Sequence, residues 1–333
     1  MTLRTARWTL TLLTLLCAPA LAWNAEGHHV VGSIADQLLN DHAKQEVAGL
    51  LGTDLRTASA WADCAKSVER RSDGTFHYVV NRQFERPCTS LDHDAMVDYV
   101  SRNWDHCLYE DMPTNCHKAF HFTDVAIQHD DYERTFIGTS DHDVVSAINA
   151  AVMVLQGQAA PDPFRIKDKT EALFLLSHFL GDVHQPLHVG AVYLDGDGNK
   201  VNPDQGTFDN HSETAGGNLI SEESSSGENL HAHWDAIPRR LSERADAFML
   251  AEARVVPRSA GPMEGWPAAW ASETVLAAHQ AFQGLSFTGT GEQRWSVQFD
   301  DMRSYVRNEN ALKEQQIAKA GARLAELLNA IWP

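Results

Sequence analysis

The strongest constraint on the fold is a pair of ionisable side chains inside the most apolar stretch of the sequence. Residues 169–181 include Ala172-Leu-Phe-Leu-Leu176, and this density of apolar residues predicts a central buried helix. His178 lies within it and Asp182 follows four residues later, a spacing that puts both side chains on one face of a helix. Because a buried imidazole and a buried carboxylate need polar partners, we expect other polar side chains or metal ions to meet them in the interior.

The same spacing of histidine and aspartate occurs a second time, at His231 and Asp235. His188 stands six residues after Asp182, just beyond Pro186, where a helix must end or bend. Neutral imidazole and carboxylate are side-chain groups that bind Zn²⁺ in sites built from nitrogen and oxygen. One such pair indicates only an ion pair on a helix face, but two pairs and a flanking histidine together predict a metal site.

Most of the remaining sequence also has helical periodicity, and strand signals are sparse. Asn40 and Asp41 are typical of a helix N-terminus, and we expect the helix that they begin to end at Leu51. Further helices are expected over residues 141–155, 242–255, 270–283 and 310–331. The stretch 195–228 is rich in Gly, Asn, Asp and Ser, which predicts an excursion with a short hairpin near residues 216–220. No change of composition separates two domains, so we expect one mainly α domain over residues 23–333.

The N-terminal segment has the three parts of an export signal. Two arginines precede an apolar run that ends at Cys17, and Ala20-Leu-Ala22 resembles a recognition sequence for cleavage. The run is too short to cross a membrane, and no later stretch reaches the roughly 18 apolar residues that a span needs. We therefore expect a leader at residues 1–22 and export of the remainder to the periplasm or the medium.

The charge of the chain narrows the ways in which it can bind a substrate. The 333 residues carry a formal charge of −18, and the expected leader holds two arginines and no acidic residue. The exported part is therefore still more acidic, which argues against a broad basic face that binds phosphate chains. A nucleic-acid substrate stays open, because bound divalent ions can supply positive charge locally.

The cysteines support the expectation of export. Four of them lie beyond the expected leader, at Cys64, Cys88, Cys107 and Cys116. An even number in an exported chain indicates two disulfides, for which three pairings are possible. We favour Cys64–Cys88 and Cys107–Cys116, because local pairs close short loops.

Six short elements resemble, in the same order, those of the zinc-dependent, single-strand-specific nuclease family of the S1/P1 type, which is related to zinc phospholipase C. They are Trp23-Asn-Ala-Glu-Gly-His28, Trp61-Ala-Asp63-Cys-Ala-Lys66, His121-Phe122-Thr-Asp124, His178-Phe-Leu-Gly-Asp182-Val-His-Gln-Pro-Leu-His188, Gly216-Gly-Asn218 and Asn229-Leu-His231-Ala-His-Trp-Asp235. The resemblance spans residues 23 to 332, and elements of this length and order are specific. Lys66 stands where the family has a phosphate-contacting arginine, so the charge is kept and the bidentate fork is lost.

The resemblance implies a mainly helical, single-domain fold around a cleft that holds three Zn²⁺ ions. The implied ligands of the first zinc are Asp63, His121, His178 and Asp182. The implied ligands of the second zinc are His188, His231 and Asp235. The third zinc is implied to bind His28, Asp182 and the α-amine and carbonyl oxygen of Trp23, which would be the first residue after removal of the leader.

The resemblance also implies hydrolysis of single-stranded DNA and RNA, and of 3′-nucleotides, to 5′-phosphorylated products through a zinc-bound hydroxide. Clustered zinc ions suit this reaction because they activate a water and stabilise the charge on the phosphoryl group and the leaving oxygen. The catalytic residues are then Asp63, Lys66 and Asp182, with Lys66 adding positive charge in the transition state. Phe122 would stack on an unpaired base and Asp124 would bond to its edge, which favours single strands without a basic face.

Three alternatives stay open from the sequence. His77, in Phe76-His-Tyr78, competes with His121 as a ligand, and we favour His121 because Asp124 and Asp131-Tyr-Glu-Arg134 also match the family. A zinc phospholipase C would have a closely similar metal cage, although the element ending in Asp235 is more typical of the nucleases. A secreted zinc-binding protein without catalysis is the third, and open coordination positions argue against it. We expect a monomer that acts on single-stranded nucleic acid or nucleotides and does not associate with a membrane.

Overall fold

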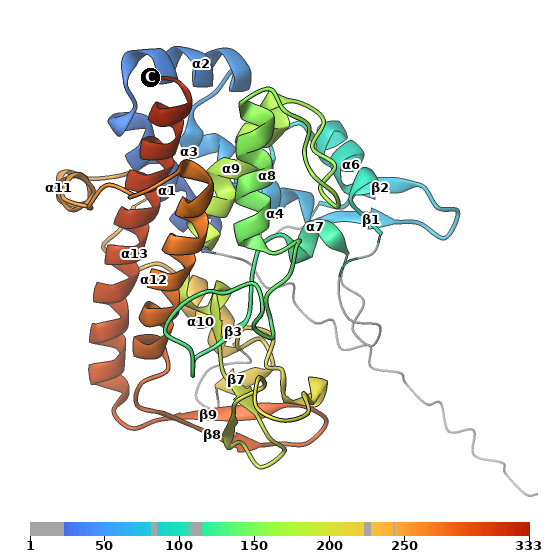
Figure 1. Ribbon diagram of the computed structural model, residues 1–333, viewed down its shortest axis with the longest axis vertical. Coiled ribbons are helices and arrows are strands. Elements are labelled where there is room, and N and C mark those ends of the chain that lie inside the picture. Colours follow the sequence, from blue (N-terminus) through green and yellow to red (C-terminus); the bar gives the residue numbers. More distant parts are fainter. Residues whose placement is uncertain (1–22, 81–84, 106, 108–114, 223–227, 243) are drawn as a thin grey trace, which may run out of the picture.

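The computed structural model describes residues 23–80, 85–105, 107, 115–222, 228–242 and 244–333. Helices form about half of this part of the chain, and the strands are two to five residues long (Figure 1). The prediction of a mainly α fold is therefore confirmed. The expected leader, residues 1–22, lies outside the described residues, and the single-domain organisation of residues 23–333 stays a prediction.

The apolar segment around His178 forms α9, Lys169–Asp182, which is buried along most of its length. The helix begins after Asp168, whose side chain accepts a hydrogen bond from the backbone N–H of Glu171 at 2.8 Å. Its neighbours are α1 (Ala25–Leu38), α2 (Asp41–Leu51), α3 (Leu55–Ala58), α4 (Trp61–Ala65), α8 (Val144–Leu155) and α13 (Met302–Ile331). Since helices surround α9, the side chains of His178 and Asp182 face the interior of the protein, as the sequence predicts.

The longest helix, α13, runs along one side of the molecule beside α1 and α12, Trp266–Ala281 (Figure 1). The contact between α1 and α13 depends on Gly321, because a Cβ at this position would lie 2.5 Å from the Cβ of Ile34. Helix α11, Ala247–Arg254, packs on the outer side of α13. The main apolar core includes side chains from both ends of the described chain, which ties the N-terminal and C-terminal segments together.

The predicted helix bounds agree with the structure best where a capping residue marks the end. Asn40 caps α2 by accepting a hydrogen bond from the N–H of Ala43 at 2.8 Å, and α2 ends at Leu51 as predicted. In contrast, α13 begins at Met302, about two turns before the predicted start. Its first turns carry mostly polar residues, and the buried positions there are Tyr305 and Glu309, so the apolar periodicity that reveals the helix begins only further along.

The cysteine-rich part of the chain lies beside α4. It contains β1 (Val68–Arg70), β2 (Phe76–Tyr78), α5 (Glu85–Cys88), α6 (His93–Arg102) and α7 (Cys116–Ala119). Disulfides join Cys64 to Cys88 and Cys107 to Cys116, so the favoured pairing is confirmed. Disulfides are typical of proteins that fold in an oxidising compartment. Within the described residues, no helix combines the length and the apolar character that crossing a membrane requires.

The remaining strands and short helices lie at the other end of the molecule (Figure 1). They are β3 (Val125–Ala126), 3₁₀ helix Pro186–His188, β4 (Gly190–Ala191), β5 (Tyr193–Leu194), β6 (Lys200–Val201), 3₁₀ helix Asn210–Ser212, β7 (Ile220–Glu222), α10 (Leu230–Asp235), β8 (Leu285–Gly289) and β9 (Trp295–Phe299). The 3₁₀ helix Met263–Gly265 lies elsewhere, directly before α12 and beside α8. β3 pairs with β4 in parallel, β5 pairs with β6 in an antiparallel hairpin, and a three-stranded sheet has the order β7-β9-β8.

The prediction of a hairpin near residues 216–220 is wrong in its position. Residues 214–220 form successive turns, and the two-stranded hairpin of this excursion is β5–β6 instead. Ile220 begins β7, which pairs in parallel with β9. The partner strand lies far along the chain, and so local glycine-rich composition could not reveal this pairing.

Candidate metal centre

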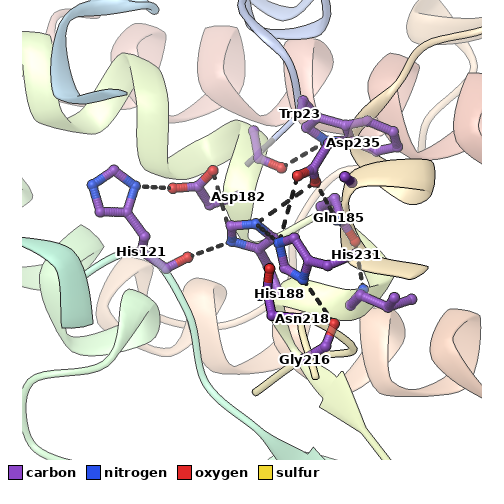
Figure 2. Close-up of polar contacts among 12 residues, drawn as sticks. Trp23, His121, Asp182, Gln185, His188, Gly216, Asn218, His231 and Asp235 are labelled. Atoms are coloured by element: carbon purple, nitrogen blue, oxygen red, sulfur yellow. Dashed lines mark hydrogen bonds and ion pairs between the residues drawn. The ribbon is translucent and has the colours of Figure 1, made fainter. Parts of the chain in front are cut away.

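Helix α9 contributes His178 and Asp182, and both side chains are fully buried. The His178 Nε2 lies 3.2 Å from the Asp182 Oδ2, as their position one turn apart predicts. His121, just after α7, places its Nδ1 2.9 Å from the same carboxylate oxygen and 3.1 Å from His178 Nε2. Asp63 of α4 completes this first group, with its Oδ1 3.5 Å from His178 Nε2. Figure 2 shows the imidazole of His121 facing the carboxylate of Asp182.

A second group forms where the short helix α10 meets the 3₁₀ helix Pro186–His188. His188 and His231 bring their Nε2 atoms within 3.0 Å of each other. Asp235 lies beside both, with its Oδ2 3.6 Å from His231 Nε2 and its Oδ1 3.9 Å from His188 Nε2 (Figure 2). The Nδ1 of His188 is also 4.0 Å from Asp182 Oδ1, so the second group adjoins the first.

The third group involves the start of α1. The Nε2 of His28 lies 3.5 Å from Asp182 Oδ1, and its ring stacks on that of His178 with centroids 3.8 Å apart. Trp23 is fully buried, and its indole N–H donates a hydrogen bond to the carbonyl of Gly181 at 3.0 Å. The next backbone N–H, of Asn24, donates to the Asp235 carbonyl at 2.8 Å, which holds this segment against α10. The resemblance places a ligand at Trp23, and the structure puts this residue beside the histidine–aspartate groups (Figure 2).

Three sets of donor atoms therefore lie close enough to share a metal ion. Within each set, one atom per residue lies within 4.8 Å of the others. The sets are His28, His178 and Asp182; Asp63, His121 and His178; and His188, His231 and Asp235. Every histidine and aspartate that the sequence assigns to the metal site falls in one of these sets. His77 does not, because it lies on β2 with its Nδ1 3.2 Å from the Glu69 carbonyl.

Backbone carbonyls fix the orientation of three imidazoles. The Nδ1 atoms of His178, His188 and His231 lie 2.7, 2.8 and 2.7 Å from the carbonyl oxygens of Ser59, His121 and Gly216. A carbonyl only accepts, so each Nδ1 carries the proton, and a neutral ring then presents a lone pair at Nε2. This is the arrangement that metal-binding histidines show.

This arrangement tests whether metal ions fit the site. The Nε2 lone pairs of His188 and His231 face each other at 3.0 Å, and neither nitrogen has a proton to share. Both ring nitrogens of His28 and the Oδ1 of Asp182 are also buried without a hydrogen bond. Facing lone pairs and unbonded buried donors need a cation. Nitrogen and carboxylate oxygen are the donor types that zinc takes, so the residues present fit zinc.

The pKa values of His28, His188 and His231 agree with neutral imidazoles. Burial, followed by the neighbouring charges of His178 and Lys66, holds the pKa of His28 well below its ordinary value. Burial lowers the pKa of His231 to about 4 and that of His188 well below the ordinary range. Burial also lowers the pKa of His178, but the carboxylates of Asp182 and Asp63 outweigh it and raise this pKa. Neutral imidazole is the form that binds a metal ion.

The carboxyl groups of Asp182 and Asp235 have pKa values that are raised. Burial raises the pKa of Asp182, and it raises the pKa of Asp235 well above the ordinary value. Ionised carboxylates in such surroundings need positive charge beside them. A divalent cation would provide it, which is a further sign that the site suits metal ions.

The predicted substrate-contacting residues lie at the edge of the first group. The Lys66 Nζ is 2.7 Å from Asp63 Oδ1, and both side chains are largely buried. Phe122 is half-buried and directly follows His121, while its carbonyl accepts a hydrogen bond from the N–H of Val144 at 3.2 Å. Lys66 thus contacts the first group through Asp63, while the roles of Lys66 and Phe122 toward a substrate stay predictions.

Asp124 has an unusual environment. Burial, with a further contribution from the charge of Glu213, raises the pKa of Asp124 to about 8. The backbone carbonyl of Asp124 accepts a hydrogen bond from the Tyr193 hydroxyl at 2.8 Å, and Tyr193 forms an antiparallel bridge with Glu213. Residues opposite each other in such a bridge share one face, so Glu213 lies on the side of Tyr193 that approaches Asp124.

Several residues that shape the site were not predicted from the sequence. Gln185 donates a hydrogen bond from its Nε2 to Asp235 Oδ1 at 2.7 Å, and its place in the longest matching element, between His184 and His188, was the available signal. The acceptors at Ser59 and Gly216 are backbone carbonyls, so side-chain identity gives no signal for them. Glu213 lies within the excursion and has no motif of its own.

The fold and the site define a mainly helical protein with three histidine–aspartate groups suited to metal ions. The sequence profile of the S1/P1 nucleases matches residues 23–108 and 99–333. Because these matches cover almost the entire described chain, the protein belongs to the S1/P1 nuclease family.

Individual relatives agree with this assignment. Nuclease P1 of Penicillium citrinum is 26% identical over 339 residues, covering 93% of this chain and 97% of that protein. Endonuclease 2 of Arabidopsis thaliana is 24% identical over 350 residues, covering 97% of this chain and 95% of that protein. Endonuclease 4 of Arabidopsis thaliana is 29% identical over 194 residues, and there the chain spans about half, 52%, of the relative's length.

Proposed function

We propose that the protein is an exported, zinc-dependent nuclease that hydrolyses single-stranded DNA and RNA, with 3′-nucleotides as further substrates. The observation that carries this proposal is the meeting of three histidine–aspartate groups around Asp182, in a chain of the S1/P1 nuclease family. The proposed ligands of three zinc ions are Asp63, His121, His178 and Asp182 for the first, His188, His231 and Asp235 for the second, and Trp23, His28 and Asp182 for the third.

The chain's own residues prepare the site for a negatively charged substrate. When bound, zinc ions would supply Lewis acidity and a water of lowered pKa for attack on phosphorus. Asp63 holds the ammonium of Lys66 at 2.7 Å, so this charge is fixed beside the first group. From there Lys66 stabilises the negative charge that develops on the phosphoryl oxygens. Asp182 keeps the imidazoles of two groups in register through both of its oxygens.

A single unpaired base fits the edge of this site. The half-buried ring of Phe122 offers a surface for stacking, which favours unpaired bases whatever their sequence. With a pKa of about 8, the Asp124 carboxyl keeps its proton at neutral pH. A protonated carboxyl both donates and accepts, so it matches a base edge that offers an amino group beside a ring nitrogen. Recognition by stacking and hydrogen bonds is compatible with the acidic composition of the chain.

The proposed export also bears on the site. Removal of residues 1–22 would leave the α-amine of Trp23 beside His28 and Asp182, where the third zinc is proposed. The two disulfides support folding in an oxidising compartment. Both features are what a nuclease of the periplasm or the medium requires.

The test is an activity panel on the purified chain that begins at Trp23. The substrates are one sequence as single-stranded DNA, double-stranded DNA and RNA, a 3′-mononucleotide, and phosphatidylcholine vesicles. We expect faster cleavage of the single strand than of the duplex, products with 5′-phosphates by mass spectrometry, loss of activity with a chelator and recovery with zinc. Hydrolysis of the phospholipid alone would identify a phospholipase C, and inertness of the fully zinc-loaded protein on all substrates would identify a non-catalytic zinc binder.

A further inference from the structure

Helix α10 carries two residues of the second group, although it is only six residues long. A helix of this length does not persist on its own in water, so its position depends on tertiary contacts. Its N-terminus is capped by Asn229, which accepts a hydrogen bond from the N–H of Ala232 at 2.7 Å. The position of Asp235, the last residue of α10, depends on what holds the other end.

The side chain of His233 connects α10 to two other elements. Its Nδ1 lies 2.8 Å from the Glu222 Oε1 of β7, and its Nε2 lies 2.8 Å from the Glu309 Oε2 of α13. Both glutamate side chains are almost completely buried. His233 therefore links α10 to β7 and α13 on the side away from His231 and Asp235.

Lys313 of α13 holds the C-terminal end of α10. Its side chain is buried, with 2% of the residue exposed, and forms an ion pair with Glu309. The Nζ donates hydrogen bonds to the carbonyl oxygens of His233 and Ala236, both at 2.7 Å. The last carbonyls of a helix have no partner within the helix, and a lysine near them both satisfies them and complements the helix dipole. These two carbonyls lie on either side of Asp235.

We propose that Lys313 is a positioning residue for the second metal, acting through the C-terminal end of α10 on Asp235. This inference rests on the proposed zinc-dependent function. The ammonium anchors the two carbonyls that flank Asp235, and Glu309 keeps the ammonium in place. Removing the ammonium releases the end of α10, so the donor atoms of His188, His231 and Asp235 no longer meet at one point. The first group has no residue on α10 and keeps its ligands. The third group has no ligand side chain on α10, and its link to this helix is the hydrogen bond from the Asn24 N–H to the Asp235 carbonyl, so we expect it to be affected less than the second group.

The experiment compares Lys313→Met with Lys319→Met, which makes the same substitution on the same helix at a more exposed lysine that pairs with Glu273. Zinc per chain is measured by metal analysis at graded free zinc, alongside circular dichroism and melting temperature. For Lys313→Met we expect the affinity for the zinc of the second group to fall roughly 10–100-fold, the usual effect of losing a partner outside the ligand shell, and the other two zinc ions to be weakened much less. Lys319→Met should hold all three as the wild type does.

Activity and a second variant complete the test. The activity lost in Lys313→Met should return when free zinc is raised to refill the weakened site, an effect that general destabilisation does not produce. If Lys313→Met does not fold, Lys313→Arg keeps the buried charge, changes the donor geometry and should show the same selective weakening. Equal weakening of all three sites, or unchanged affinity in the folded variant, would overturn the proposal. Wild-type protein that binds no zinc would instead refute the proposed function, so the wild type is measured first.

Discussion

At the scale of single residues, the carboxylate of Asp182 lies within 4.0 Å of ring nitrogens from four histidines. Its Oδ2 is 2.9 Å from His121 and 3.2 Å from His178, whereas its Oδ1 is 3.5 Å from His28 and 4.0 Å from His188. Such a carboxylate can contact more than one cation and offset part of the charge of each. Asparagine has nearly the same shape as aspartate but no charge. The substitution Asp182→Asn therefore removes the electrostatic role of this residue while keeping its packing.

Replacement of Asp182 is therefore expected to be the most damaging single change. We predict that Asp182→Asn loses at least one zinc and that activity falls by several orders of magnitude. Lys66→Ala should keep all three zinc ions and lose about 10²–10³ in rate, the usual scale for one transition-state contact. Phe122→Ala should mainly weaken substrate binding, by about 1–3 kcal/mol. Metal analysis and steady-state kinetics test this order, and a fully metallated, active Asp182→Asn protein would place the catalytic centre elsewhere.

The raised pKa of Asp124 predicts a pH-dependent effect on stability. In the folded chain this carboxyl keeps its proton up to about pH 8, whereas in the unfolded chain it ionises near 3.8. Its contribution to stability is complete below the unfolded pKa and is lost as the pH rises through the folded pKa. Asn has no such dependence, so Asp124→Asn should gain stability relative to the wild type between pH 5 and pH 9. Denaturation of both proteins at the two pH values measures this, and an equal difference at both would show that Asp124 is ionised when folded.

At the scale of elements, α9 and α1 approach so closely that a side chain at one position would disturb the metal-binding groups. A Cβ on Gly181 would lie 2.6 Å from the Nδ1 of His28. We predict that Gly181→Ala displaces His28, removes one zinc and lowers the melting temperature. The matched control is Gly49→Ala in α2, where no atom lies within 4 Å of the added Cβ. That change should stabilise the protein by about 0.4–1 kcal/mol by restricting the unfolded chain. Equal zinc content in both variants would contradict the prediction.

Elements with their own local signals could be predicted from the sequence, whereas elements held by distant partners could not. Helix α2 has a capping asparagine, and α9 has a dense apolar run, so each is recognisable in a short window. β7 is only three residues long, and β9 lies far along the chain. The start of α13 is hidden for a related reason, since exposed polar turns have no periodic pattern.

The residues of the candidate site also fall into two kinds, those that the sequence reveals and those that only the structure reveals. Histidines and aspartates at one-turn spacing are visible as His178 with Asp182 and as His231 with Asp235, because helical geometry brings such pairs together. The contribution of Lys313 to α10 is not visible in this way, because its partners are backbone carbonyls on a remote segment. The orienting carbonyls near the imidazoles share this property. Sequence therefore indicates the ligands, and the structure is needed to find what holds them.

At the scale of the whole molecule, the metal-binding groups join segments from α1 to α10. We predict that removing zinc lowers the melting temperature substantially, because ions that bind only the folded chain stabilise it by mass action. The measurement is calorimetry of the zinc-loaded protein, of the chelator-treated protein with zinc removal verified, and of the same sample after zinc is restored. Unchanged melting after verified removal would show that the buried groups hold their geometry without a cation.

The position of Trp23 has a practical consequence for anyone producing the protein. The indole is fully enclosed, and the following backbone N–H is bonded to Asp235 beside the metal-binding groups. In the proposed mature chain, which begins at Trp23, an affinity tag fused directly before this residue would lead foreign chain into these surroundings and convert the terminal amine into an amide. Pro333 is exposed and follows the end of α13, beside His42 and α2 and away from the metal-binding groups (Figure 1). Purification handles therefore belong at the C-terminus, and the first residue of a recombinant product should be verified by mass before any metal titration is interpreted.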